Sequence, residues 1–336
     1  MLHRRCVAAV VILLVDAVRG AASVEWMHVP PFNGRCVFSL RPTGARFIMT
    51  SQPAFIQVGA LADGFAPNSH ILATVGDLEG RTLVLTFADG GVDTLHFDTA
   101  ESVEVERVPA GARRPAQPRE RHACRVTSLR AGIYFVDYIG ADEPLVDADG
   151  QPRASGTSYV LDLNKQLCTV VVGVLPGERE TRIDAFTRVE RGMELTGVQA
   201  QILHGRIGAD AGAHGAALHA PTTELIGMRN LYIYSATERY EHIYLNDNFY
   251  AWQCLSGVEA GLGDVDRCHT IGIDTALYLF IWREKIVPTL GVVMIDLERM
   301  KTDGKIFGYH GSRFDALSNF PVGAHARVLN VTRHPE

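Results

Sequence analysis

The fold is decided by four segments, YIYSATERYEHIYLN (residues 232–246), WQCLSG (252–257), LYLFIWRE (277–284) and GVVMIDL (291–297). Aromatic and charged residues recur in them at alternating positions, which places side chains of one kind on one face of successive strands. We therefore expect a β-barrel whose inner face presents aromatic side chains, one arginine and one acidic residue to a ligand.

The first half of the chain carries the same kind of signal. Residues 81–87 alternate and end at ADGG (88–91), which is a hairpin turn signal, and residues 92–97 then alternate again. Helical periodicity is weak throughout the chain, so the sequence predicts a mainly β protein.

The second half of the chain restates the first in the same order. The matched blocks are 78–81 with 225–229, 133–138 with 277–282, 159–166 with 293–300, and 197–203 with 323–329. Each copy has the length that closes an antiparallel barrel of about eight strands, whose interior holds one small ligand. A segment of small residues, 208–221, is predicted to link the copies. The predicted architecture is two tandem antiparallel β-barrels.

The composition excludes several classes of partner. Hydrophobic residues make up 47% of the 336 residues, enough for a large core, and the net charge is -6. Nucleic acids and anionic membranes need a basic surface that this charge balance does not supply. The six cysteines form no CxxC pair and the histidines no HExxH motif, so we predict neither a metal nor a cofactor. A small molecule is the expected partner, and a homo-oligomer is left open.

Residues 1–48 are interpreted as an N-terminal extension, either signal-like or mis-assigned. Arg4 and Arg5 precede an apolar run, and residues 20–23 are small, as in a secretory signal. The run is too short to span a membrane. The character of the sequence changes at Met49, which we predict to be the natural start. The protein is then expected to be cytoplasmic, whereas a genuine signal would make it an exported one.

From about Phe55 to the C-terminus the chain resembles the MoaF family, which has two tandem calycin-like domains. The segments that carry the resemblance are YEHIYLN (240–246), WQCLSG (252–257), LYLFIWREK (277–285) and GKIFGY (304–309). The resemblance implies one calycin- or lipocalin-like barrel over residues 55–207 and another over residues 222–332. The family name has been linked to molybdenum cofactor biosynthesis and to a monoamine-responsive operon, and neither link implies a biochemical activity.

The second half is also similar to the phenolic acid decarboxylases, calycin-type barrels that release carbon dioxide from 4-hydroxycinnamates without a cofactor. Their Tyr-x-Tyr pair matches Tyr232 and Tyr234, and the proton-donating glutamate of their Trp-x-Glu matches Glu284. A buried carboxylic acid can hold that proton, because desolvation raises its pKa. The resemblance implies a catalytic set of Glu284, Arg267, Tyr232 and Tyr234, with Tyr240, Trp252 and Trp282 as substrate-binding residues.

The residues also support plainer interpretations. Glu284 lies in a charged run, 283–285, which is typical of a solvated strand end, and strand tyrosines pack in cores more often than they bind ligands. The first copy has Tyr138-Ile-Gly140 in place of Trp282-Arg-Glu284, so we expect an inert barrel that packs against or covers its partner. The two functional hypotheses are a lyase acting on an aromatic or phenolic acid-like metabolite, and a non-catalytic binding or accessory protein.

Overall fold

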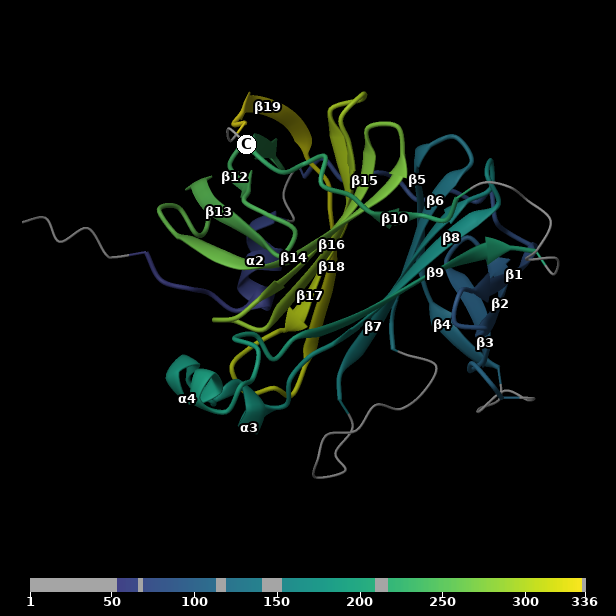
Figure 1. Cartoon of the computed structure of the whole chain (residues 1–336), viewed down its shortest axis with the longest axis horizontal. Helices are drawn as coiled ribbons and strands as arrows, with labels where there is room; N and C mark the ends of the chain where they lie inside the picture. The colour runs from purple at the N-terminus through teal and green to yellow at the C-terminus, as the bar shows by residue number, and fades with distance from the viewer. Residues whose placement is uncertain (1–52, 66–68, 113–118, 141–152, 209–216, 334–336) are drawn as a thin grey trace, which may run out of the picture. The chain divides into compact units, whose positions relative to one another are not determined.

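Antiparallel strands build most of the structure, which is a computed structural model. It describes residues 53–65, 69–112, 119–140, 153–208 and 217–333, all within the unit Pro53–Glu336. The predicted extension 1–48 and residues 209–216 of the predicted linker lie outside the described residues. Figure 1 shows two groups of strands, coloured from blue to teal and from green to yellow. No helix in the described part of the chain is long and apolar enough to cross a membrane.

The first barrel is a nine-stranded sheet with the order β4-β3-β2-β1-β9-β8-β7-β6-β5. Only Cys124 separates β4 from β5, and these strands pair with β3 and β6 respectively, so one kinked segment brings the two ends of the sheet together. The strands are β1 (Thr82–Phe87), β2 (Val92–Thr99), β3 (Ser102–Val108), β4 (Glu120–Ala123), β5 (Arg125–Arg130), β6 (Ile133–Ile139), β7 (Ser155–Asp162), β8 (Leu167–Val174) and β9 (Gln199–Ile207).

The second barrel repeats this order, and one long strand replaces the kinked segment. That strand, β14 (Gly263–Asp274), pairs first with β13 and then with β15, which closes the sheet. The other strands of the closed sheet are β11 (Met228–Ile233), β12 (Arg239–Tyr244), β13 (Phe249–Ser256), β15 (Leu277–Glu284), β16 (Thr289–Asp296), β17 (Lys301–Tyr309) and β19 (His325–Val331). Two further strands, β10 (Ala220–Pro221) and β18 (Leu317–Val322), pair with β14 and β17.

The repeated sequence blocks occupy equivalent places in the two sheets, and the predicted pair of tandem antiparallel β-barrels is confirmed. The blocks lead into β1 and β11, form most of β6 and β15, lead from β7 and β16 into a turn, and enter β9 and β19. The two turns use the same device, since Asp162 and Asp296 each accept backbone N–H groups two and three residues later. Both turns end in a left-handed residue, Gln166 at φ 56° and Met300 at φ 52°.

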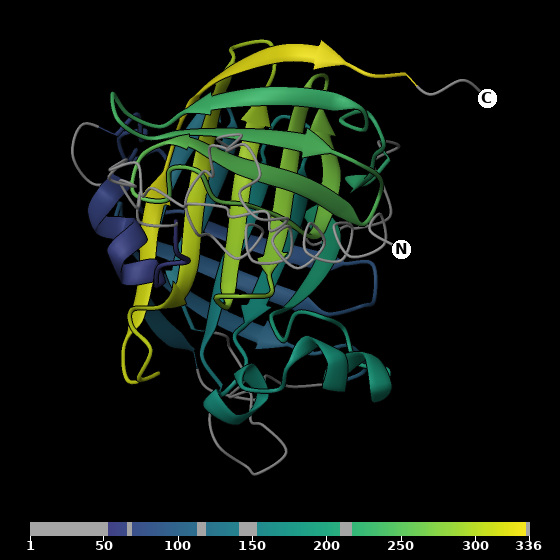
Figure 2. The ribbon, with the colours of Figure 1, turned by 90° about the vertical axis from the view of Figure 1, so that its left-hand side faces the viewer.

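The helices are short. α3 (Glu178–Thr181) and α4 (Ala185–Glu190) lie between β8 and β9, and the Asp184 side chain caps α4 by accepting the backbone N–H of Thr187 at 2.9 Å. α2 (Val58–Phe65) precedes the first barrel in the sequence, yet it packs against β17 and β18 of the second barrel, as Figure 2 shows.

Three apolar cores follow from the alternation of side chains. Two fill the interiors of the barrels, and the third lies between them. The third is made by outward-facing side chains of β6 to β8 and of β15 to β17, such as Phe135, Val171, Ile281 and Val292. These strands are buried on both faces, which explains why LYLFIWRE is apolar at nearly every position.

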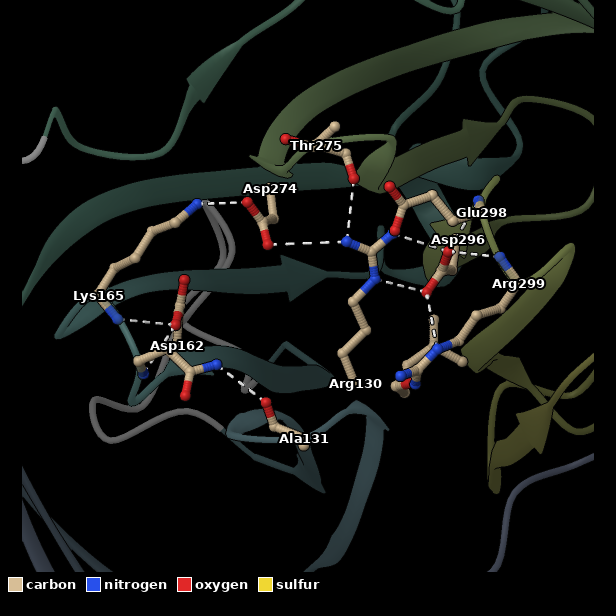
Figure 3. Close-up of polar contacts among 11 residues, drawn as sticks. Arg130, Ala131, Asp162, Lys165, Asp274, Thr275, Asp296, Glu298 and Arg299 are labelled. Carbon is tan, nitrogen blue, oxygen red and sulfur yellow. Dashed lines mark hydrogen bonds and ion pairs between the residues drawn. The ribbon is translucent and has the colours of Figure 1, made fainter.

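Ion pairs surround the core between the barrels. Arg130 of β5 donates hydrogen bonds to both oxygens of Asp296 in β16, at 2.7 and 2.8 Å, and Figure 3 shows its guanidinium among several carboxylates. The ammonium of Lys305 lies 2.5 Å from the carboxylate of Asp137, and both side chains are buried. Removing one member of a buried pair is costly, so we expect these pairs to fix the way in which the barrels dock.

Candidate functional site

One end of the interior of the second barrel is lined by aromatic and acidic side chains. Alternate residues of β11, β12, β13 and β15 face inward, which gathers side chains that are distant in the sequence. They enclose a cavity of about 30 Å³, room for about two water molecules. The lining residues are Leu61, Phe65, Tyr234, Tyr240, His242, Tyr250, Trp252, Glu259, Trp282, Glu284 and Ile306.

Glu284 is the last inward-facing residue of β15. Its neighbour Arg283 points outward and pairs with Glu194, so the charged run at this strand end is divided between two faces. The Glu284 carboxyl group accepts the indole N–H of Trp282 at 2.8 Å. Burial of the carboxyl and the nearby charge of Asp266 raise the pKa of Glu284 well above its usual value, which favours the protonated form.

Two further acids lie close to this carboxyl group. Asp266 accepts the indole N–H of Trp252 at 2.9 Å, and Glu259 accepts the hydroxyl of Tyr240 at 3.0 Å. Burial raises the pKa of both acids, and these hydrogen bonds oppose the shift only in part. This end of the barrel therefore concentrates carboxyl groups whose charged forms are disfavoured.

His242 stands at the centre of the aromatic side chains. Its ring lies 4.8 Å from that of Tyr232, 5.1 Å from that of Tyr250 and 6.0 Å from that of Trp282. Burial lowers the pKa of His242 to about 3, so its imidazole is neutral. Its Nδ1 atom has no hydrogen-bond partner among the described residues, which leaves it able to bond a ligand.

The structure brings five of the residues predicted from the sequence to one cavity. These are Tyr234, Tyr240, Trp252, Trp282 and Glu284. Tyr232 lies elsewhere in the barrel interior, where its hydroxyl is 2.7 Å from that of Tyr244 and accepts a hydrogen bond from Asn230 at 3.2 Å. Tyr232 therefore supports the aromatic wall and does not itself line the cavity.

Arg267 is not brought to the cavity. Asp266 and Cys268 face the interior, so Arg267 between them faces outward. Its guanidinium lies 4.8 Å from the centroid of the Phe249 ring and 3.5 Å from the Glu194 carboxylate. The position of Arg267 does not fit the part expected for it, which was to hold a ligand's charge inside the barrel.

α2 fills the mouth of the cavity. The Phe65 ring lies 4.8 Å from that of Tyr234 and 5.7 Å from that of Tyr240. The backbone N–H of Gly59 donates to the carbonyl of His310 at 3.2 Å, and a Cβ on Gly59 would lie only 2.5 Å from that oxygen. The seat of the helix therefore requires glycine at this close approach.

Sequence reasoning missed several lining residues, for different reasons. His242 alternates with Tyr240 and Tyr244, so the strand period alone could have placed it inward. Glu259 follows β13 in a turn, where no period applies. Leu61 and Phe65 belong to a helix that no sequence pattern ties to the second barrel. No group of three or more His, Cys, Asp or Glu side chains in the described residues is placed to hold a metal ion.

Comparison with known proteins gives the family. Residues 53–177 match the model of the MoaF N-terminal domain, and residues 219–332 match that of the MoaF C-terminal domain. The chain is 48% identical over 291 residues to Protein MoaF of Klebsiella aerogenes, which covers 86% of this chain and 100% of that protein. The chain belongs to the MoaF family. A solved chain described as a candidate beta-lactamase from Burkholderia vietnamiensis has 13% identity, covers 31% of this chain and 95% of its own, and has a TM-score of 0.27, too low to inform the fold.

The family match places α2 in a different domain from the rest of the cavity lining. Val58–Phe65 falls within the range matched by the MoaF N-terminal domain, whereas every other residue that lines the cavity belongs to the MoaF C-terminal domain. The cavity is thus made by the C-terminal domain and closed by a piece of the N-terminal one.

Proposed function

We propose that the second barrel binds a small aromatic molecule that carries a hydrogen-bond donor, such as a phenol or an aromatic amine. The observation that supports this is the position of Phe65, whose ring packs against Tyr234 and Tyr240 as an aromatic ligand would. The side chain comes from a separate helix, so a ligand ring of the same size can replace it.

The polar groups of the cavity favour a ligand that donates hydrogen bonds over one that carries a carboxylate. Glu259 and Glu284 line it with raised pKa values, and His242 adds a neutral imidazole. Among the described lining residues there is no lysine or arginine to neutralise an anion. A phenol or an ammonium group can donate to the carboxyl oxygens or to His242, whereas a carboxylate would lose its hydration with no cationic side chain among the described lining residues to compensate for the loss.

The space available requires α2 to move when a ligand enters. A cavity of about 30 Å³ holds water but no aromatic ring. Leu61 and Phe65 are the lining residues of α2, and removing them from the mouth opens the aromatic walls. We therefore place the ligand where these two side chains now lie.

A cofactor-independent lyase is the second candidate, and the raised pKa of Glu284 favours it. A protonated Glu284 can deliver its proton to the alkene carbon of a 4-hydroxycinnamate. The bond to the carboxylate then breaks, carbon dioxide leaves, and the electron pair restores the alkene of a 4-vinylphenol. Since Arg267 faces outward, the substrate carboxylate would have to be held without it.

The experiment measures thermal unfolding of the full chain with catechol, phenethylamine and 4-hydroxycinnamate. Binding at one hundred times the dissociation constant stabilises the folded state by about 2.7 kcal/mol, a readily measured rise in Tm. We expect catechol or phenethylamine to stabilise the protein. A panel in which none of the three probes raises Tm would refute an aromatic ligand in this barrel.

The same probes separate the two candidates. Release of 4-vinylphenol from 4-hydroxycinnamate that is lost in Glu284→Gln, with binding retained, supports the lyase. Binding without product supports the carrier. Glu190→Gln, an exposed residue of α4, is the matched control for the change of charge.

A further inference from the structure

The acids around the cavity of the second barrel differ from several buried acids elsewhere in the described barrels. Those acids are each held by a base, in the pairs Asp93–Arg107, Asp137–Lys305 and Asp296–Arg130. Glu259 and Glu284, in contrast, have no lysine or arginine partner among the described residues. Beside Glu259 lies a further acid, Glu238, which is 2% exposed and whose charge also disfavours ionisation of Glu259.

The charged side chains nearest to the Glu284 carboxyl group do not balance it. Asp266 of β14 is a second acid, and its charge raises the pKa of Glu284. Lys285 follows Glu284 in the sequence, but its ammonium lies 2.6 Å from the carboxylate of Asp264 and 3.4 Å from that of Asp266. Lys285 is therefore engaged by two other acids and does not neutralise Glu284.

The remaining side chains around Glu284 are uncharged near neutral pH. Burial lowers the pKa of His242 on β12 to about 3. Burial raises the pKa of the tyrosines that line the cavity above the usual value, namely Tyr234, Tyr240 and Tyr250. α2 and β17 contribute apolar side chains, and β16 contributes the hydroxyl of Thr289. Among the described residues, Glu284 is thus surrounded by acids and uncharged groups.

His242 gives an independent indication of a hydrogen-bonding ligand. It lines the cavity and is 6% exposed, and its Nδ1 atom has no hydrogen-bond partner among the described residues. Leaving such a group without a partner costs about 1–3 kcal/mol. A primary ammonium group has three N–H donors and a phenol hydroxyl has one, so only the ammonium can bond a carboxylate and the imidazole together.

We propose that the second barrel binds its aromatic ligand as an ammonium cation and that binding expels a proton from Glu284, an inference that rests on the proposed function because it uses the same cavity. The O–H bond of the Glu284 carboxylic acid breaks, the proton leaves to solvent, and the carboxylate pairs with the ammonium group. One positive charge enters as another leaves, so the barrel interior gains no net charge.

Glu284 is the acid that holds this proton. The neighbouring charges of Asp266 and Glu259 both disfavour its ionised form, in addition to burial. An ammonium group supplies the counterion that the described residues lack and so lowers the pKa of Glu284 in the complex. Because each bound cation displaces one proton, affinity should rise up to about tenfold per pH unit until the pH reaches the pKa of Glu284 in the free protein.

The test compares phenethylamine with 2-phenylethanol, which has the same ring and chain and a hydroxyl in place of the ammonium group. Isothermal titration calorimetry of the full chain, in buffers of different ionisation enthalpy from about pH 5 to about pH 8, gives the number of protons released per ligand. We expect phenethylamine to release about one proton at the acidic end of this range and to bind more tightly as the pH rises. 2-Phenylethanol should release none, and its affinity should not rise with pH.

Glu284→Gln keeps the shape of the side chain and has no proton to release. We expect it to bind phenethylamine about tenfold or more weakly than the wild type, without proton release, and to bind 2-phenylethanol as the wild type does. Glu190→Gln on α4, an exposed position, is the matched control and should behave as the wild type.

The proton count of the wild type decides the matter even if the variant does not fold. Phenethylamine binding without proton release, or proton release that persists in Glu284→Gln, would overturn the inference. Binding of 2-phenylethanol or catechol without phenethylamine would also overturn it and would leave the proposed aromatic ligand standing. A protein that binds none of these probes would refute the proposed function as well.

Discussion

Replacing Phe65 with alanine tests whether α2 competes with a ligand for the second barrel. The Phe65 side chain is 3% exposed, and its ring contacts those of Tyr234, Tyr240 and Phe320. Truncating a buried phenylalanine removes about 3 kcal/mol or more of packing free energy. The lost free energy weakens the packing of α2 on the second barrel and not the barrel itself, because the barrel wall beneath α2 is closed by its own strands.

The consequence is a gain of affinity. When a ligand binds only the state with α2 displaced, the apparent dissociation constant equals the intrinsic one divided by the fraction of that state. Weakening the seat by about 3 kcal/mol therefore tightens apparent binding by up to roughly a hundredfold, until α2 is mostly displaced without ligand. Binding of phenethylamine or catechol can be followed by tryptophan fluorescence, because Trp252 and Trp282 line the cavity.

The matched control is Asp63→Ala, an exposed position of the same helix, which should leave the affinity unchanged. The reasoning is refuted by a Phe65→Ala protein that is folded and binds the probe no more tightly than the wild type. In that case α2 is a fixed part of the barrel, and a ligand has to enter elsewhere.

Three further predictions concern the acids, the barrel interface and Arg267. Because the pKa of Glu284 is raised in the folded state, the wild type loses stability as the pH rises from about 4.5 to that pKa. Glutamine does not titrate, so over this range the free energy of unfolding of Glu284→Gln, measured in urea, should rise relative to that of the wild type by up to about 1.4 kcal/mol per pH unit. Lys305→Ala leaves Asp137 buried without its ammonium partner and should cost about 3–5 kcal/mol in urea unfolding, more than Lys305→Met combined with Asp137→Leu. Arg267→Ala should bind the probe with an affinity within about twofold of the wild-type value in fluorescence titrations, because the Arg267 side chain lies outside the barrel. A larger loss of affinity would mean that Arg267 does contribute to ligand binding.

The strand period accounts for what the sequence could predict of the site. Trp282 and Glu284 are two residues apart on β15, so they share a face, and the same spacing relates Tyr232 of β11 to Tyr234, which directly follows that strand. The period also divides the charged run at 283–285 between the two faces of the strand, since Arg283 lies on the face that meets the first barrel. The charged run at this strand end thus contains an acid that faces the barrel interior and a buried base that faces outward.

The same period argues against Arg267, which was placed in the site by resemblance. Asp266 faces inward, so Arg267, its neighbour on the same strand, faces outward. The packing of α2 on the second barrel could not be predicted from the sequence for another reason. It depends on contacts between segments far apart in the chain, such as Phe65 with Tyr240, which no local pattern encodes.

The contacts on the two faces of β17 show why displacing α2 would leave the barrels intact. Its inward residues Ile306 and Gly308 meet the cavity and α2, where a Cβ on Gly308 would lie 2.4 Å from a Val58 methyl group. Its outward residues Lys305 and Phe307 are held by the first barrel and the core between the barrels. Displacing α2 therefore removes contacts from one face of a strand that stays anchored by the other. The cost of opening is confined to the helix and its few apolar side chains, which is what makes local opening cheaper than unfolding.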